Sequence, residues 1–241
     1  MTQRVALVTG AGKGMGREIV RQLASRGIHV VFGVRRADAI RAIEAETAAA
    51  GGSSRGVLLD VTDAAAVAAA ADSIRATEGR LDILVNNAGI AVNRAAAPGE
   101  VRTEDLRRTY EVNVFGLVAV TNAVLPLLLA SPAGRIVNQS TSMGSLRVQG
   151  RLAPPYVDMA WLAYDSSKAA VNEITIEYAK QLRGTPVLVN ATAPGQVSTD
   201  LNGNGRGKTA AEGAELAVML ATLPAGSPTA RLWDAGGPID W

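Results

Sequence analysis

Thr9-Gly10-Ala11-Gly12-Lys13-Gly14-Met15-Gly16 directly follows an apolar run near the start of the chain. A glycine-rich turn between a first strand and a helix lets backbone amides approach a pyrophosphate, and the positive end of the helix dipole favours that anion. The spacing is T-G-x-x-x-G-x-G rather than the better-known G-x-G-x-x-G, and glycines also mark ordinary turns. Its place after the first predicted strand is what favours a nucleotide site. That site would be formed by Gly10, Gly12, Lys13, Gly14, Met15 and Gly16.

Downstream of this turn, short β-branched runs alternate with longer Ala-rich segments of helical composition. Near-continuous apolar strands are typical of a parallel sheet that helices cover on both faces. Strands are predicted over Val5–Thr9, His29–Gly33, Gly56–Asp60, Ile83–Asn86, Arg135–Ser140, Val187–Ala191 and Arg231–Trp233. Helices are predicted to begin near Gly14, Ala37, Asp63, Thr103, Pro155 and Thr209.

No linker or repeat divides the 241 residues. The predicted fold class is therefore α/β, with one Rossmann-type, doubly wound domain over residues 1–241. Its mostly parallel, seven-stranded sheet should have the order 3-2-1-4-5-6-7 and helices on both sides. Two stretches rich in Gly, Pro or Asn, residues 142–161 and 198–208, are predicted loops, and each follows a strand at the edge where such sheets bind ligands.

Composition excludes several classes of function. The chain has no cysteine and one histidine, His29, so it has no disulfides, thiolate metal sites, multi-histidine metal sites or histidine-based triads. The net charge is only +2 and the basic residues are scattered, so no nucleic-acid partner is expected. The N-terminal apolar run is too short to span a membrane and lacks a signal-peptide pattern, which predicts a cytoplasmic protein without a membrane partner.

The residues after the second predicted strand indicate which dinucleotide would bind. An acidic residue there would accept hydrogen bonds from the adenosine ribose and select NAD. This chain has Arg35 and Arg36 instead, and guanidinium groups suit a 2′-phosphate. Lys13 would add a second positive charge from the glycine-rich turn. Two solvated arginines at a strand end are the alternative, but the absence of a carboxylate favours NADP(H).

A second pattern, Tyr164-Asp165-Ser166-Ser167-Lys168, places Tyr164 and Lys168 one helical turn apart. A phenol has a pKa near ~10 and is a poor base at neutral pH, but a neighbouring ammonium lowers that pKa. Tyr164 would then donate a proton while a carbonyl is reduced, or accept one while an alcohol is oxidised. The spacing alone is common on exposed helices.

In combination these motifs are more specific. The glycine-rich turn, Asn86-Asn87-Ala88-Gly89 and the Tyr164/Lys168 pair follow one another in an order that resembles the short-chain dehydrogenase/reductase family. The resemblance covers essentially the whole chain. Further matching stretches are Leu59-Asp60-Val61, Glu111-Val112-Asn113-Val114, Arg135-Ile136-Val137-Asn138 and Pro194-Gly195-Gln196-Val197-Ser198-Thr199.

The resemblance implies a role for each matched residue. Asp60 and Val61 would flank the adenine, and Val197 and Thr199 would lie near the carboxamide of the nicotinamide. Asn113 would join the catalytic proton relay, while Lys168 would also hold the ribose. The cofactor cleft would be lined by Asn86, Asn87, Ala88, Gly89, Pro194 and Gly195. Backbone capping is a second explanation for the asparagines, and both can hold.

Two positions depart from the family pattern. Ile136-Val137-Asn138-Gln139-Ser140-Thr141-Ser142 places Thr141 where the family usually has the serine that polarises the substrate carbonyl. Threonine keeps the hydroxyl donor but adds a methyl group. Thr141 takes that role, Ser140 or Ser142 takes it after a local shift, or the chemistry is altered, in that order of preference. The other departure, Gln196, would make the pocket floor more polar.

Within the family the chain is most similar to the NADPH-dependent carbonyl-reductase-like branch. Shared features are Gly12-Lys13-Gly14, Arg35 and a lengthened loop before Tyr164. Trp161 and Tyr156 in that loop would either wall the substrate pocket or pack the loop. Some members of this branch are monomers because an added loop covers the helices through which relatives pair. Here the loop is modest, so monomer and homo-oligomer both stay open.

The expected activity is hydride transfer between NADPH and a ketone, aldehyde or quinone-like carbonyl, or the reverse. Thr141, Tyr164, Lys168 and Asn113 would form the catalytic set, without a metal. One alternative keeps the cofactor but performs imine reduction, epimerisation or a redox-neutral cyclisation. Another is a nucleotide-binding scaffold without turnover, which would have no need for Tyr164, Lys168 and Asn113 together.

Overall fold

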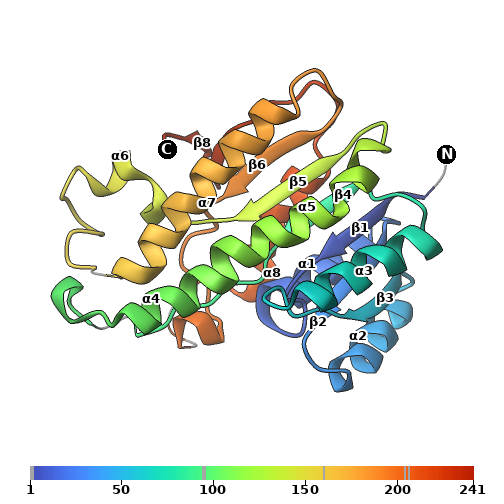
Figure 1. Ribbon diagram of the computed structural model, residues 1–241, viewed down its shortest axis with the longest axis horizontal. Helices are drawn as coiled ribbons and strands as arrows, with labels where there is room; N and C mark the ends of the chain where they lie inside the picture. The colour runs from blue at the N-terminus through green and yellow to red at the C-terminus, as the bar shows by residue number, and fades with distance from the viewer. Residues whose placement is uncertain (1–2, 94–95, 160, 204, 206) are drawn as a thin grey trace.

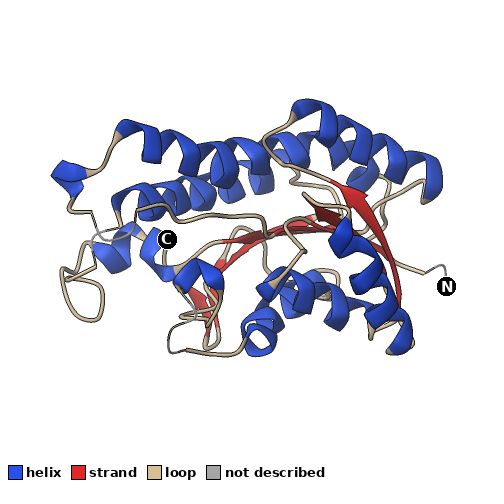
Figure 2. Ribbon diagram, turned by 90° about the horizontal axis from the view of Figure 1, so that it is seen from below, coloured by secondary structure: helices blue, strands red, loops and turns tan. Residues whose placement is uncertain are grey.

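An eight-stranded sheet runs through the middle of the molecule with helices on both faces (Figure 2). The computed structural model describes residues 3–93, 96–159, 161–203, 205 and 207–241. The strand order is β3-β2-β1-β4-β5-β6-β7-β8, and every pair is parallel except β7 with β8. The strands are β1 (Val5–Val8), β2 (His29–Val34), β3 (Ser53–Leu58), β4 (Ile83–Asn86), β5 (Arg135–Gln139), β6 (Leu188–Thr192), β7 (Leu232–Asp234) and β8 (Gly237–Ile239).

The predicted fold class and the order of the first seven strands are confirmed, but the sheet has one strand more than predicted. β8 forms when the chain turns back after β7 and pairs Leu232 with Ile239. β3 begins at Ser53 rather than at Gly56, because its ladder with β2 pairs His29 with Ser53. Asp60 consequently lies beyond the end of the strand.

The helices cover the two faces as the alternation of side chains along the strands requires. One core lies between the sheet and the α3, α5 and α7 helices, and includes Leu7, Leu84 and Ile136. The other lies between the sheet and α1, α2 and α8, and includes Val8 and Val85. The helices are α1 (Gly14–Ala24), α2 (Asp38–Ala49), α3 (Ala64–Thr77), α4 (Thr103–Tyr110), α5 (Gly116–Leu129), α6 (Leu146–Gln149), α7 (Leu162–Gln181) and α8 (Ala210–Ala221).

α4 and α5 form one continuous helix, Thr103–Leu129, joined by a π-helical turn over Glu111–Phe115 (Figure 1). The sequence predicted its start at Thr103 but not its length. By length and composition this helix could cross a membrane, yet 50% of its most apolar stretch is buried within the fold. Val124 and Leu128 are among the side chains that it contributes to the core.

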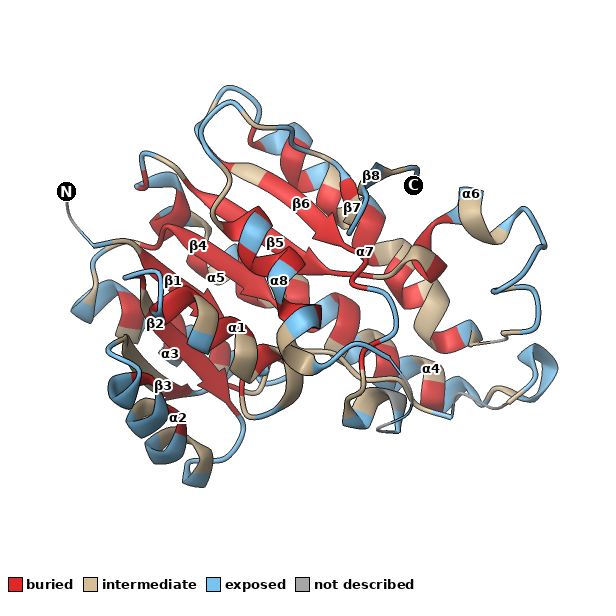
Figure 3. Ribbon diagram, turned by 180° about the vertical axis from the view of Figure 1, so that it is seen from behind, coloured by how far each residue is buried: buried red, intermediate tan, exposed pale blue. Residues whose placement is uncertain are grey.

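The predicted helix start near Pro155 is wrong, because α7 begins at Leu162. Residues 154–158 form turns instead. The hydroxyl of Tyr156 bonds to Ser142 Oγ at 2.8 Å, which holds this segment against the preceding loop rather than in line with α7. The segment with α6 projects from the body of the molecule and is largely exposed (Figure 3).

Candidate active site

The glycine-rich turn between β1 and α1 packs directly against the end of β4. Gly10 has φ +65°, and a Cβ added there would lie 2.8 Å from Ala88 Cα. A Cβ on Gly16 would lie 2.5 Å from Asn87 Nδ2 and from Gly10 O. Thr9 Oγ1 accepts the backbone N–H groups of Asn87 and Ala88, each at 3.0 Å. Glycine is therefore required at 10 and 16 because two backbone segments touch.

The segment after β6 covers the other side of this turn. A Cβ on Gly14, which has φ +56°, would lie 3.5 Å from Thr199 Cγ2. Val197 is buried, and both it and the Met15 sulfur lie against Gly213 at the start of α8. Pro194 is buried too, and Gly195 is exposed with φ +80°. The predicted cofactor residues from the first, fourth and sixth strands thus meet at one edge of the sheet.

Arg35 is the predicted phosphate ligand, and the structure leaves it accessible. It is exposed and makes no hydrogen bond or ion pair with any residue that the structure describes. The backbone N–H of Thr62, with a smaller contribution from the charge of Arg35, lowers the pKa of Asp60. By contrast, Arg36 forms an ion pair with Asp38.

Lys13 and Val61 both have partners within the chain. Lys13 forms an exposed ion pair with Asp200 at the start of the 3-10 turn η4 (Asp200–Asn202), a contact of small energetic weight. Val61 is 8% exposed, and a Cβ on Gly116 would lie 2.6 Å from its Cγ2. Its side chain therefore packs mainly against the start of α5.

Tyr164 and Lys168 lie in the first two turns of α7, as their spacing predicts. Lys168 is 4% exposed, and its Nζ donates to the carbonyl of Gln139 at 2.7 Å. The same nitrogen lies 5.6 Å from the centroid of the Tyr164 ring. Burial lowers the pKa of Lys168 to about 8. A buried ammonium at this distance favours the phenolate form of Tyr164.

Asn113 lies in the π-helical turn and is buried. Its amide accepts the N–H of Ile90 at 2.8 Å and donates to the Ile90 carbonyl at 2.9 Å and to Ser167 Oγ at 3.0 Å. A Cβ on Gly89 would lie 3.4 Å from Asn113 Oδ1 and 3.6 Å from Lys168 Nζ. Asn113 therefore caps the backbone after β4 and also lies beside the Lys168 ammonium.

The three neighbouring hydroxyls after β5 have different partners. Ser140 is buried and donates to Asn172 Oδ1 at 2.6 Å, inside the α7 interface. Ser142 is hydrogen-bonded to Tyr156. Thr141 Oγ1 accepts the N–H of Met143 at 3.3 Å and donates to no residue that the structure describes. Thr141 therefore keeps its proton for a substrate, whereas Ser140 uses its proton inside the interface and Ser142 already has a side-chain partner.

Asn86 does not line the cleft as the resemblance implied. Its amide is buried between β4 and β5 and donates to Thr121 Oγ1 at 3.0 Å and to Asn138 Oδ1 at 2.9 Å. Asn138 in turn donates to Thr175 Oγ1 at 2.9 Å. These side chains form a buried polar row that ties α5, the sheet and α7 together.

The remaining predicted residues, Trp161, Gln196 and His29, lie in different surroundings. The Trp161 ring lies edge-on to Tyr164 with centroids 6.0 Å apart, so it contacts the candidate proton donor. Gln196 is exposed. His29 bonds to Ser53 at 2.7 Å on the β2–β3 edge, a structural position. Within the described ranges, no cluster of His, Asp and Glu could hold a metal ion.

Sequence reasoning missed two features of the site. The backbone carbonyl of Gln139 holds Lys168, and because any residue type has such a carbonyl, the sequence does not indicate this contact. The carboxyl of Asp165 is partly buried against Gln149, and burial raises its pKa to about 7. Its position inside the Tyr164–Lys168 motif was the only available signal.

Comparisons with known proteins agree with this geometry. Residues 4–210 match the family model described as short chain dehydrogenase. Short-chain dehydrogenase/reductase 1 of Saponaria officinalis is 35% identical, with 94% of this chain and 92% of the relative covered. Salutaridine reductase of Papaver bracteatum is 33% identical, with 96% and 94% covered.

A solved structure is also similar over nearly its whole length. It is a metagenomic short-chain oxidoreductase in complex with NADP, 31% identical, with a TM-score of 0.78 and 96% of each chain covered. The family match and the site geometry concern the same residues, from the glycine-rich turn to the Tyr164/Lys168 helix. The chain therefore belongs to the short-chain dehydrogenase/reductase family of oxidoreductases.

Proposed function

We propose that this protein uses NADPH to reduce a ketone, aldehyde or quinone-like carbonyl to an alcohol, or catalyses the reverse reaction. The observation that carries the proposal is the buried Lys168 ammonium, 5.6 Å from the centroid of the Tyr164 ring. Such a pair lets a phenol exchange a proton near neutral pH. The similarity to a protein named as a reductase supports the carbonyl-reductase-like branch.

The residues present fit a dinucleotide. The turn at Gly12 and Gly14 leaves the backbone open, with no atom closer than 3.5 Å to an added Cβ. Arg35 is exposed and unpaired among the described residues, as a 2′-phosphate ligand must be. The structural relative in complex with NADP supports the same choice. When bound, the nicotinamide supplies or accepts the hydride.

The chain's own residues would handle the substrate oxygen and the proton. Thr141 would donate a hydrogen bond to the carbonyl oxygen from the end of β5. Tyr164 Oη would donate the proton to that oxygen as it becomes an alcohol, and Lys168 would lower the phenol pKa and hold the ribose. Asn113 would keep Lys168 and the backbone at Ile90 in place and connect the proton path to solvent. The proton from Tyr164 would become the hydroxyl proton of the alcohol, and the other groups would hold the oxygen and the donor in place.

The test is Tyr164→Phe, assayed with NADPH against panels of carbonyls, imines and alcohols. We expect wild type to oxidise NADPH with at least one carbonyl, and the variant to lose about 10²–10⁴-fold in kcat. Its NADPH affinity should be unchanged by fluorescence titration. A variant as fast as wild type would refute the role of Tyr164.

The cofactor choice has a separate test. Arg35→Asp should weaken NADPH binding far more than NADH binding, because it replaces the ligand of the 2′-phosphate with a charge that repels it. Arg36→Ala is the matched control, since Arg36 already pairs with Asp38. Equal losses for the two cofactors would rule out a phosphate role for Arg35.

The competing function is a nucleotide-binding scaffold, or a redox-neutral enzyme with the same cofactor. The scaffold would oxidise no NADPH with any substrate in the panel, and the redox-neutral enzyme would show turnover without net oxidation. The donor hydroxyl that Thr141 leaves uncommitted favours the reductase.

A further inference from the structure

A side-chain hydrogen bond joins the projecting segment to the catalytic helix. Gln149 Nε2, at the end of α6, donates to Asp165 Oδ2 at 3.1 Å. Asp165 directly follows Tyr164 in the first turn of α7. Its other oxygen, Oδ1, is buried and has no hydrogen-bond partner among the described residues. The contact therefore lies next to the proton donor, and the carboxyl also accepts from the Trp161 backbone.

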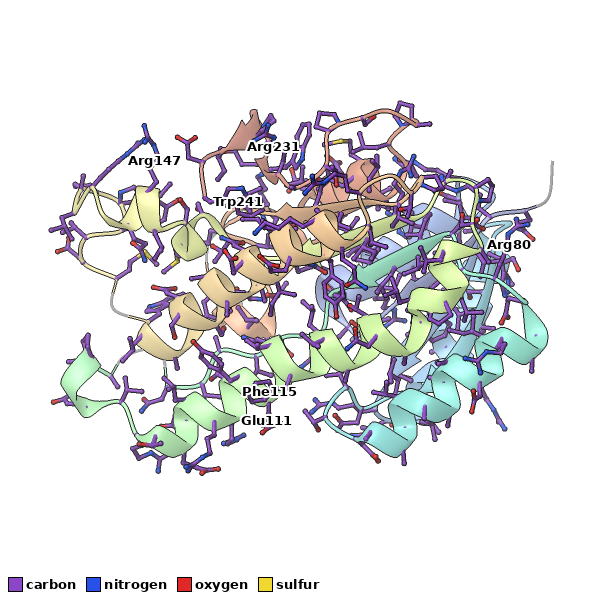
Figure 4. All side chains as sticks on the ribbon, turned by 45° about the horizontal axis from the view of Figure 1, so that its top comes forward. Arg80, Glu111, Phe115, Arg147, Arg231 and Trp241 are labelled. Carbon is purple, nitrogen blue, oxygen red and sulfur yellow. The ribbon has the colours of Figure 1, made fainter. Side chains whose placement is uncertain are left out.

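The opposite end of α6 is fixed by the C-terminal residues. Arg147 Nε lies 2.6 Å from Asp240 Oδ2, and the Arg147 backbone N–H donates to the Trp241 carbonyl at 3.2 Å. Trp241 packs against the small core at the end of β6 and β7 that contains Leu232. Figure 4 labels Arg147 on α6 and Trp241 in this tail. α6 is thus attached both to the sheet edge and to α7.

α6 is also continuous with the segment that carries Thr141. Thr141 is the N-cap of the 3-10 turn η3 (Ser142–Gly144), which ends just before α6. This turn touches α7 closely, since a Cβ on Gly144 would lie 2.8 Å from the carbonyl carbon of Lys168. The Gly144 contact and the Gln149 contact therefore hold the same segment, with Thr141 at its start, against α7.

We propose that Gln149 and Asp165 are positioning residues: their hydrogen bond holds α6 against the first turn of α7 and sets the place of Thr141, and of the bound substrate, relative to Tyr164. This inference rests on the proposed function. Neither residue touches the reacting atoms. They act on the substrate side, because the other predicted cofactor residues follow β1, β2, β4 and β6, and Lys168 of α7, which would hold the ribose, bonds to Gln139 rather than to either of them.

The charge state of Asp165 should control this contact. Arg147 of α6 pairs with Asp240 and Lys168 of α7 donates to Gln139, and no charged side chain among the described residues contributes to the pKa of Asp165. Burial raises the pKa of Asp165 to about 7. The hydrogen bonds from Gln149 and from the Trp161 backbone lower this pKa, so both are stronger to the ionised carboxylate than to the neutral carboxyl. Substrate affinity should therefore rise as the pH passes through 7.

The experiment compares Gln149→Ala, Asp165→Asn and wild type, with Ser166→Ala as the control. The Ser166 hydroxyl bonds only to carbonyls of its own helix. We expect Gln149→Ala to lower kcat/KM about tenfold, the equivalent of one hydrogen bond, with unchanged NADPH affinity. Asp165→Asn keeps an acceptor for Gln149, so it should match wild type at pH 6. Wild-type KM should fall between pH 6 and 8, whereas Asp165→Asn should lack this fall.

Wild-type kcat/KM in Gln149→Ala, or the same KM profile in wild type and Asp165→Asn, would overturn the proposal. Amide hydrogen exchange gives a readout that needs no turnover. At pH 8, residues 146–150 should exchange faster in Asp165→Asn and in Gln149→Ala than in wild type. If these exchange differences appear while no carbonyl is reduced, the contact is as described and the proposed function fails. If reduction occurs without the exchange differences, the positioning role fails alone.

Discussion

The cofactor side and the substrate side of this site are built in different ways. On the cofactor side, the closest contacts are made by the glycine backbone: a Cβ added to Gly10 or Gly16 would lie 2.5–2.8 Å from its neighbours. On the substrate side, side chains make the connections of the projecting segment: Ser142 to Tyr156, Gln149 to Asp165 and Arg147 to Asp240. The first side lies over strands inside the body, and the second projects from it (Figure 3).

The two sides therefore differ in the substitutions that they tolerate. A side chain at Gly10 or Gly16 would force neighbouring atoms to shift, because its Cβ would lie 2.5–2.8 Å from them, so substitution at these positions destabilises the fold. A side-chain contact can be replaced by another pair of the same length and polarity. The substrate side can therefore change its specificity while the cofactor side stays the same.

Lys168 lies where the two sides meet, so Lys168→Met should give the largest loss, about 10²–10⁴-fold in kcat. The same variant also tests whether the Lys168 ammonium is buried in the folded protein. The folded pKa of Lys168 is about 8 and its ordinary value is 10.5, so the unfolded chain binds more protons between these values. Wild type should therefore gain stability as the pH rises through this window. Lys168→Met should lack that gain in melting curves from pH 7 to 10.5, and identical slopes would mean that Lys168 is not desolvated.

Thr141 tests the substrate side alone. Thr141→Ala removes the proposed donor to the carbonyl oxygen and should lower kcat about 10²–10³-fold, whereas Thr141→Ser should stay within about threefold of wild type. Ser140→Ala is the contrast, because it breaks the buried bond to Asn172 and should lower the melting temperature with little effect on kcat. If Ser140→Ala instead lowered kcat and Thr141→Ala lowered only the melting temperature, the hydroxyl that binds the carbonyl oxygen would be that of Ser140.

Gly16→Ala tests the cofactor side. The new methyl group would meet Asn87 Nδ2 and Gly10 O at 2.5 Å, so we expect a loss of about 1–3 kcal/mol in the free energy of unfolding. Gly12→Ala is the matched control, since its nearest neighbour is Val34 Cγ1 at 3.8 Å. It should keep the stability of wild type and lose NADPH affinity only. Urea titrations and cofactor titrations separate the two, and equal stability of both variants would contradict the close contact.

The smallest effect is expected for Asp165→Asn on stability. The folded pKa of Asp165, about 7, lies above its ordinary value of 3.8, so the folded state binds more protons between them. Wild type should lose stability as the pH rises through this window, and Asp165→Asn should lack that loss. After allowance for partial exposure, we expect about 1 kcal/mol at pH 8, or roughly 2–4 °C in Tm, and almost no difference at pH 4. A difference that did not change with pH would show that Asp165 does not carry a proton here.

The cofactor side could be predicted from sequence because its contacts require particular residue types. Glycine at 10 and 16 and arginine at 35 each follow from a local physical need, and the apolar strands give the sheet order. The substrate side could not, because the partner of Asp165 lies in a segment with no periodicity. The sequence did not show that Ser140 points into the α7 interface while Thr141 does not. Which of these side chains faces α7 depends on the exact residue at which β5 ends, and strand propensity does not determine that residue.

The π-helical turn at Glu111–Phe115 has a consequence for the phase of the long helix. An α-helix advances about 100° per residue, so a single wide turn changes which direction every later side chain faces. Ahead of the turn, α4 directs its buried Asp105 and Thr109 inward, and beyond it α5 directs Val120 and Val124 into the core. The buried faces of α4 and α5 therefore point in directions that do not follow one continuous α-helical period, and Asn113 lies in the turn between them. Deleting one residue from the turn would rotate one face out of the core, whereas an insertion ahead of Thr103, where the helix begins, would leave both faces as they are.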